Sequence, residues 1–355
     1  MRFYLSQNMF CERELLLAEY GDMKAYAFKY STGVAAVRVE NNIGSFTILP
    51  FQGQQIWRAD FCGRNLVMKT GFDEPIMTKE YLKTYGGFLL HCGINAFGVP
   101  GKGDNHTQHG ELPNAEYDVA YIDCGSDKDG NYMAIGGEYE YKAAFTKNYV
   151  FRPECRLYES GTILNVRIEL ENRRSYPMEY MYLCHINFNP VDGAELIYTA
   201  PYDGEHIKIY KSDVNTELLG YISRLERNIT MHHSVGSDGE CYDPEICFAV
   251  KYSSDENGRA YTMQYTDNGA DFVSHPVNFL PFGIRWISRT ADEAAMGMVL
   301  PATAEHLGYT HAKESGQIKI LKPKEKISFM IQAGYLPSES ASNMKDRISE
   351  IMKRR

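Results

Sequence analysis

Short runs of apolar and β-branched residues recur along the chain from Ile43 onward, and Gly, Asn, Asp and Pro separate them. This pattern is typical of many antiparallel strands joined by turns. The runs that we expect to form strands are Ser45–Leu49, Gln55–Phe61, Tyr117–Ile122, Gly137–Phe145, Ile163–Leu170, Glu179–Phe188, Ile207–Tyr210, Ile246–Tyr252, Tyr261–Tyr265, Gly283–Ile287, Gln317–Leu321 and Lys326–Ala333. The pattern therefore predicts an all-β chain.

Helical periodicity is confined to two short segments, Cys11–Glu19 and Asn343–Lys353. In the second segment one helix face carries the apolar side chains of Met344, Ile348, Ile351 and Met352. We expect both segments to pack on the outside or at the edges of the sheet. No internal repeat, linker or low-complexity tract is visible, so we expect residues 1–355 to form one domain.

Composition excludes several classes of protein. The 26 Tyr, 17 Phe and 2 Trp supply a large core, and the net charge of −9 includes no basic stripe except Lys353-Arg354-Arg355. No apolar run approaches the roughly 20 residues of a membrane span, and the first residues lack a signal-peptide core. The eight Cys are scattered, without Cys-x-x-Cys pairs, which favours buried thiols over disulfides. We expect a soluble cytoplasmic protein with no nucleic-acid or membrane partner.

Two polar segments each contain a histidine that is a candidate for chemistry. His109 begins His-Gly-Glu-Leu-Pro-Asn, near the end of a polar loop, and His185 lies in Tyr-Leu-Cys-His-Ile-Asn-Phe-Asn. Strand alternation puts His185, Asn187 and Asn189 on one face, which suggests a strand that opens into a polar cleft. A buried histidine satisfied by a neighbour is the alternative. Imidazole both gives and accepts a proton near neutrality, so the two histidines indicate acid–base work on a sugar ring.

The sequence gives little support for a metal or cofactor site. His106 and His109 could bind a metal with Asp104 or Glu111, but no further ligand spacing supports zinc. The glycines from Gly98 onward do not form a phosphate loop, because no helix follows them. We expect no metal and no cofactor.

Several motifs resemble the aldose 1-epimerase (galactose mutarotase) superfamily, and most closely its poorly characterised bacterial branch. They follow the family order: Ile48–Trp57 with Gly63–Leu66, Gly86–Gly98, His109-Gly110, His185–Asn189, and Leu280–Trp286 leading into Gly297–Thr303. The resemblance implies an antiparallel β-supersandwich with few short helices, which holds a sugar in an open cleft.

The resemblance also implies roles for individual residues. His185 matches the general acid of the family, and His109 matches the second histidine, which bonds the substrate near the ring oxygen. We expect four further residues to contact the substrate: Asn105, Glu111, Asn187 and Trp286. Trp286 is as well explained by a place in the core as by a place on the cleft floor.

Two departures from the family pattern bear on function. The general base of the family is a glutamate, typically within Glu-Pro-Ala-Thr, whereas this chain has Leu300-Pro-Ala-Thr303. Glu305 is a candidate replacement, and a solvated loop carboxylate is its alternative explanation. The branch often has arginine where this chain has Glu111, which favours a neutral sugar over a phosphorylated one.

Three functions remain open. The first is an isomerase that interconverts the anomers of an aldose by acid–base ring opening. The second is a carbohydrate-binding protein that has lost the general base and does not catalyse a reaction. The third is another sugar-active enzyme on the same scaffold, because a fold does not fix a function.

Overall fold

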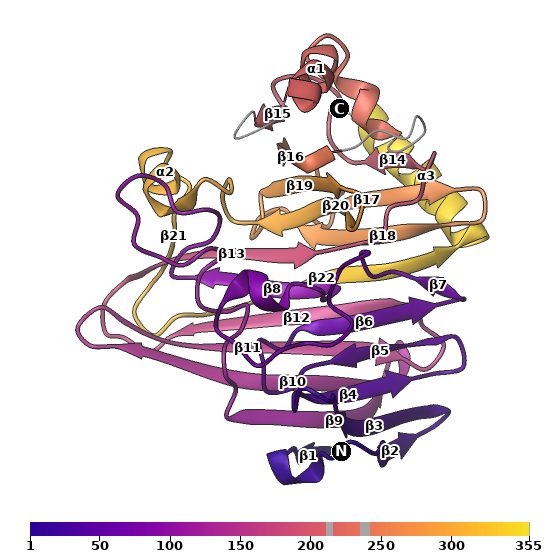
Figure 1. Ribbon diagram of the computed structural model, residues 1–355, viewed down its shortest axis with the longest axis vertical. Helices are drawn as coiled ribbons and strands as arrows, with labels where there is room; N and C mark the ends of the chain where they lie inside the picture. Colours follow the sequence, from indigo (N-terminus) through magenta and orange to yellow (C-terminus); the bar gives the residue numbers. More distant parts are fainter. Residues whose placement is uncertain (211–215, 235–241, 355) are drawn as a thin grey trace.

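Antiparallel strands dominate the secondary structure of the computed structural model, which describes residues 1–210, 216–234 and 242–354 (Figure 1). In this described part, nine strands form one sheet in the order β1-β9-β10-β11-β12-β22-β18-β17-β14. Their bounds are β1 Arg2–Tyr4, β9 Val119–Asp127, β10 Gly130–Ala143, β11 Lys147–Tyr158, β12 Ile163–Asn172, β22 Lys326–Pro337, β18 Gly269–Pro276, β17 Arg259–Thr266 and β14 Glu195–Tyr198. The all-β prediction is confirmed.

The second sheet contains thirteen strands within the described residues, and eleven of them follow the order β15-β16-β19-β20-β13-β8-β6-β5-β4-β3-β2. Their bounds are β15 Ile207–Tyr210, β16 Tyr242–Lys251, β19 Phe282–Arg289, β20 Ala294–Ala302, β13 Met178–Ile186, β8 Leu89–Ile94, β6 Ile56–Phe61, β5 Gly44–Ile48, β4 Ala35–Glu40, β3 Met23–Lys29 and β2 Leu15–Tyr20. Two short strands complete it: β21 (Lys319–Leu321) pairs with β13, and β7 (Arg64–Asn65) pairs with β6.

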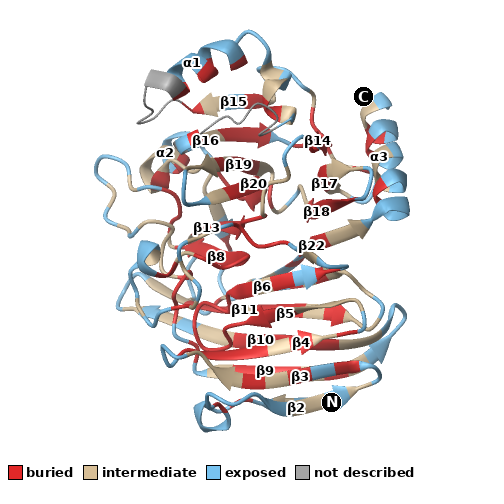
Figure 2. Ribbon diagram, turned by 45° about the vertical axis from the view of Figure 1, so that its right-hand side comes forward, coloured by how far each residue is buried: buried red, intermediate tan, exposed pale blue. Residues whose placement is uncertain are grey.

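Buried side chains from both sheets form one extensive hydrophobic cluster. Phe46 of β5, Tyr149 of β11 and Tyr182 of β13 are fully buried members of it. Figure 2 shows buried residues along most strands of both sheets. The apolar area removed from water is the main term that stabilises such a sandwich, so the site described below rests on a rigid scaffold.

Helices are few in the described residues, and they lie outside the sheets (Figure 1). They are α1 (Thr216–Leu225), α2 (Gly308–Glu314), α3 (Ser338–Lys353) and the 3-10 turns η1 (Gln7–Met9), η2 (Tyr81–Thr84) and η3 (Ile229–His233). In α3, Ala341, Ile348 and Ile351 are buried against β14, β17 and β18. The predicted C-terminal helix is thus confirmed.

The helix predicted at Cys11–Glu19 is wrong. Residues Leu15–Tyr20 form β2, which pairs with β3 through a tight turn at Gly21, where φ is +60°. A short apolar run fits either a helix or a strand, and here the tertiary pairing decides. The N-terminal segment therefore extends the larger sheet.

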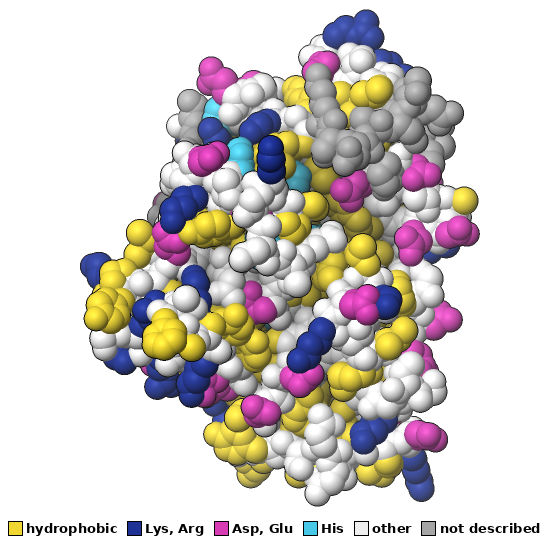
Figure 3. Space-filling model, turned by 60° about the vertical axis from the view of Figure 1, so that its left-hand side comes forward, with side chains coloured by type: hydrophobic (Ala, Val, Ile, Leu, Met, Phe, Trp, Pro, Cys, Tyr) yellow, Lys and Arg dark blue, Asp and Glu magenta, His cyan; other side chains and the backbone are white. Residues whose placement is uncertain are grey.

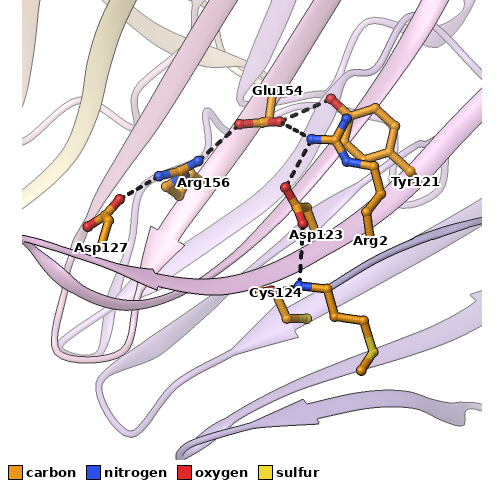
Figure 4. Close-up of polar contacts among 8 residues, drawn as sticks. Arg2, Tyr121, Asp123, Cys124, Asp127, Glu154 and Arg156 are labelled. Carbon is orange, nitrogen blue, oxygen red and sulfur yellow. Dashed lines mark hydrogen bonds and ion pairs between the residues drawn. The ribbon is translucent and has the colours of Figure 1, made fainter.

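Strand β1 lies at the edge of the smaller sheet, where charged groups fix it (Figure 4). The guanidinium of Arg2 donates to Asp123 at 2.9 Å and to Glu154 at 3.3 Å. Glu154 also accepts the Tyr121 hydroxyl at 3.0 Å and lies 3.4 Å from a guanidinium nitrogen of Arg156. These contacts hold the chain start against β9, because each carboxylate serves more than one donor.

All seven cysteines within the described residues are free thiols, and Cys241 lies outside them. Four of the seven are buried, as expected, whereas Cys11 and Cys62 are exposed. No helix in the described part of the chain is long and apolar enough to cross a membrane. On the face drawn in Figure 3, Lys and Arg side chains lie on several parts of the surface together with Asp and Glu side chains.

Candidate active site

Strand β13 carries His185 into the interior near the end of the strand. His185 pairs in register with Leu90 of β8, and Leu183 pairs with Ala302 of β20. The side chain of His185 is 4% exposed and that of Asn187 is fully buried. The strand thus delivers a histidine to a site that bulk water barely reaches.

The loop before β9 places His109 by backbone geometry. His109 has a left-handed φ of +59°, and its amide donates to the Gly98 carbonyl at 3.1 Å. Gly110 follows with φ +80°, and a Cβ there would lie 2.2 Å from the Ala96 carbonyl oxygen. Only glycine fits this position, which explains the His-Gly sequence physically. A non-glycine residue with positive φ is uncommon and often marks a functional site.

Asp104 fixes the same loop to α2. Its carboxylate accepts the Thr310 amide at 3.0 Å, the Thr310 hydroxyl at 2.6 Å and the Gly101 amide at 2.9 Å. Burial acts to raise the pKa of Asp104, but these hydrogen bonds outweigh it and lower the pKa to about 2. Asp104 is therefore ionised at neutral pH and holds the loop in place.

The two histidines meet although they come from separate segments. Their ring centroids are 5.2 Å apart at 82°, an edge-to-face arrangement. Trp286 of β19 packs on His185 at 5.4 Å, and Tyr81 packs on His109 at 4.8 Å. These rings belong to the wall of a cavity of about 100 Å³. The wall combines polar groups with apolar side chains: Tyr81, Leu82, Tyr85, Gly98, Val99, Gln108, His109, Leu183, His185, Glu245, Cys247, Ile284, Trp286, Leu300 and His306.

Asn187 fixes the tautomer of His185. The Asn187 amide nitrogen donates to the Gly87 carbonyl at 2.9 Å, so its oxygen must be the atom that lies 2.7 Å from Nδ1 of His185. Nδ1 therefore carries the hydrogen, and Nε2 presents a lone pair. The Tyr85 hydroxyl lies 3.2 Å from Nε2 and completes the surroundings of the ring.

Burial keeps the histidines of the cavity neutral. It lowers the pKa of His185 to about 4, although the hydrogen bond to Asn187 acts in the opposite direction. Burial, followed by the nearby charge of His185, holds the pKa of His109 well below its ordinary value. Burial also lowers the pKa of His306 to about 4. At neutral pH the site therefore contains imidazoles that accept a proton, and His185 acts as an acid only after protonation.

Some predicted site residues lie elsewhere. Glu305 does not line the cavity, and its carboxylate contacts His311 at 2.7 Å and Lys208 at 3.3 Å. Glu111 accepts the backbone amides of Ile94 and Asn95, each at 3.0 Å, and also the Tyr149 hydroxyl. Burial raises the pKa of Glu111. Asn105 is exposed on the loop and is not part of the cavity wall. The structure thus brings together His109, His185 and Trp286, with Asn187 behind His185.

Leu300 occupies part of the cavity wall from β20 and is 2% exposed. Glu245 of β16 also lines the cavity, and sequence analysis did not identify it. The Trp286 Nε1–H donates to Glu245 Oε2 at 2.5 Å. No motif surrounds Glu245, and only its place on the strand that pairs with the Trp286 strand could have indicated it. No group of three or more His, Cys, Asp or Glu among the described residues is arranged to hold a metal ion.

The sequence matches a family defined by a domain of unknown function, DUF4432, over residues 31–334. The chain belongs to this family. No curated protein has a significant sequence match to it.

Comparison with solved structures identifies the fold of this DUF4432 chain. It is similar to a proposed aldose 1-epimerase from Klebsiella pneumoniae, with a TM-score of 0.83 at 15% identity over 99% of this chain and 96% of the other. A galactose mutarotase-like protein from Clostridium acetobutylicum gives 0.60 at 13% identity over 89% and 99%. The GalM/aldose epimerase homologue from C. elegans gives 0.53 at 11% over 85% and 98%. At these identities the likeness establishes the mutarotase-like β-sandwich fold alone, as the sequence motifs predict.

Proposed function

We propose that this DUF4432 protein is a carbohydrate-active isomerase that interconverts the anomers of a neutral monosaccharide by acid–base ring opening. The observation that carries the proposal is the edge-to-face pair of His109 and His185, 5.2 Å apart in one cavity with Trp286. A sugar ring offers oxygens to imidazole and a C–H face to an aromatic ring. This combination suits a pyranose better than a fully apolar ligand.

The character of the cavity supports the choice of substrate class. No Lys or Arg of the described residues lines it, so nothing there would compensate a phosphate or carboxylate group. Pockets that take drug-sized ligands measure about 300–1,000 Å³, whereas this cavity measures about 100 Å³. One sugar ring is therefore the expected ligand, rather than an oligosaccharide.

His185 is the proposed acid. When Nε2 is protonated, Nδ1 keeps its hydrogen bond to Asn187, and Nε2–H can be delivered to the ring oxygen. The C1–O5 bond then breaks while O1 loses its proton and forms the carbonyl. After rotation about the C1–C2 bond, the same transfers run in reverse and close the ring as the other anomer.

The experiment follows exchange between anomers by NMR for a panel of neutral aldoses. The wild type should accelerate exchange of at least one aldose, and His185→Ala should lower the rate by about 10²–10⁴-fold, the usual contribution of a general acid. His206→Ala serves as the matched control, because His206 is a partly exposed histidine paired with Asp203. A wild type that leaves the exchange of every bound aldose unchanged would contradict the proposal.

A second candidate is a carbohydrate-binding protein without catalysis. Leu300 favours it, because an apolar side chain takes part in the cavity wall at the place where the family has its base. In that case aldoses bind to both the wild type and Leu300→Ala, and neither protein changes the rate of anomer exchange. Calorimetric binding and the NMR assay together separate the two functions.

A further inference from the structure

We infer that Glu245 is the general base of this site and that it replaces, from strand β16, the carboxylate that is missing at Leu300. The inference rests on the proposed function, since a general base is needed only if the cavity opens a sugar ring. Among the described residues that line the cavity, Glu245 is the one carboxylic acid.

Glu245 lies on β16 just before the regular pairing of this strand with β19 begins at Ile246. This strand pairs antiparallel with β19, and Cys247 lies opposite Trp286. The register shifts between Tyr242 and Ile246, so Glu245 lies within a bulged part of the strand. A bulge re-aims a side chain and is common next to active sites. Glu245 and Cys247 are two residues apart on the strand and both line the cavity.

Trp286 connects Glu245 with the histidine pair. Its indole N–H donates to Oε2 of Glu245 at 2.5 Å, and its ring lies 5.4 Å from the His185 ring at 74°. The other carboxylate oxygen, Oε1, lies 3.9 Å from the Cys247 thiol, which is a weak donor. One oxygen is thus oriented by Trp286 and the other remains available to a substrate hydroxyl.

The charge of the Glu245 carboxylate acts on two tyrosines of the cavity wall. Burial is the main cause that raises the pKa of Tyr81 and Tyr85, and the negative charge of Glu245 adds to it for both. Glu245 itself is exposed, and no Lys or Arg within the described ranges pairs with it. The carboxylate of Glu305 differs from that of Glu245, because it already forms ion pairs with Lys208 and His311.

The proton transfers balance with this assignment. Glu245 takes the proton from O1–H, the O1–C1 double bond forms, and the C1–O5 bond breaks as O5 takes the Nε2 proton of His185. Rotation about the C1–C2 bond presents the other face of the carbonyl to O5. O5 then returns its proton to His185, and Glu245 returns its proton to O1. Acid and base are both restored, and no co-reactant is consumed.

The test is Glu245→Gln, which keeps the size of the side chain and an oxygen acceptor for Trp286. We expect kcat for anomer exchange to fall by about 10²–10⁴-fold, with KM changed only a few-fold. Glu19→Gln is the matched control, because Glu19 is an exposed carboxylate of β2 paired with Lys24. This control should keep the wild-type rate. Circular dichroism establishes that each variant is folded.

A double variant sharpens the test. Leu300→Glu combined with Glu245→Gln returns a carboxylate to the wall from β20, and it should recover part of the lost rate. Should Glu245→Gln fail to fold, Glu245→Asp replaces it and should lower kcat by withdrawing the carboxylate from O1.

The outcomes separate this inference from the proposed function. If the wild type is active, His185→Ala is impaired and Glu245→Gln is as fast as the wild type, the base assignment is wrong while the proposed function stands. A Glu245→Gln protein with raised KM and unchanged kcat makes Glu245 a binding contact, which also overturns the assignment. If the wild type is inactive on every aldose that it binds, both proposals fall.

Discussion

The rate of anomer exchange should rise as the pH falls from 7 to 5, because His185 must be protonated before it can act as an acid. Burial lowers its pKa from the ordinary 6.5 to about 4. The imidazolium is then about one molecule in a thousand at pH 7 and about one in ten at pH 5. If the other steps do not change, kcat/KM should therefore increase about a hundredfold over this range.

The assay compares initial rates at low substrate concentration, after subtraction of the exchange that occurs without protein at each pH. The range ends at pH 5, where ordinary carboxylates remain ionised. Circular dichroism at each pH excludes partial unfolding as the cause of a change. A rate that is constant or that falls from pH 7 to pH 5 would show that His185 acts in its neutral form, and the assignment of the acid would be wrong.

Asn187→Leu provides an internal check on the same reasoning. The Asn187 oxygen favours the imidazolium of His185, so its loss should lower the pKa of His185 further. The rate should then be below that of the wild type at every pH, while its dependence on pH stays equally steep. Circular dichroism must show that the variant is folded, because a uniformly lower rate would also follow from partial unfolding. A wild-type profile in Asn187→Leu would refute the role of Asn187.

Two further predictions concern Leu300 and His275. Leu300→Ala should lower the unfolding free energy by about 2–5 kcal/mol, as for other buried leucines, and should change kcat far less than His185→Ala; urea titration and the NMR assay check both, and an equal loss of kcat would contradict it. His275 is fully buried, neither ring nitrogen has a hydrogen-bond partner in the described residues, and burial lowers its pKa to about 3. As the pH falls, the unfolded chain binds a proton at this histidine before the folded chain does. His275 therefore leaves the unfolding free energy unchanged well above pH 6.5 and lowers it by about 3 kcal/mol at pH 4. His275→Leu should therefore lose less unfolding free energy between pH 7 and pH 4 than the wild type, and an equal loss in urea titrations would refute it.

Much of the fold was predictable from sequence, because turn residues punctuate the strands of an antiparallel sheet. The segment Ile207–Tyr210 was predicted with the observed bounds, and the segment that begins at Lys326 was predicted with the observed start. Strands such as β8 and β20 were missed, because both faces of each are largely buried and neither alternates between polar and apolar residues. Periodicity cannot separate such runs from other buried segments.

The site residues were predictable only where a local sequence pattern, such as strand alternation, indicated them. His185 and Asn187 share a strand face, and the structure adds the 2.7 Å contact between them. Glu111 was expected at the substrate, whereas its carboxylate satisfies backbone amides next to β8. From sequence alone, a polar residue in a glycine-rich loop is equally well explained by hydrogen bonds to the loop backbone and by contact with a ligand. Three-dimensional context decides between them.

Strand order explains why Glu245 could not be found from the sequence. Two strands, β19 and β20, lie between β16 and β13 in the sheet, and alternation along a chain does not predict that order. The register of β16 against β19 also shifts between Tyr242 and Ile246, next to Glu245, and such an irregularity is not visible in the sequence.

The place of Leu300 fits this arrangement. Leu300 lies in register with Ile284, another apolar member of the cavity wall. A carboxylate at this position would be desolvated, and its pKa would rise, so a smaller fraction of it would be ionised near neutrality. The carboxylate of Glu245, by contrast, is exposed to solvent and accepts the indole N–H of Trp286. Moving the base to β16 therefore allows an apolar wall at β20 while a proton acceptor is kept at the cavity.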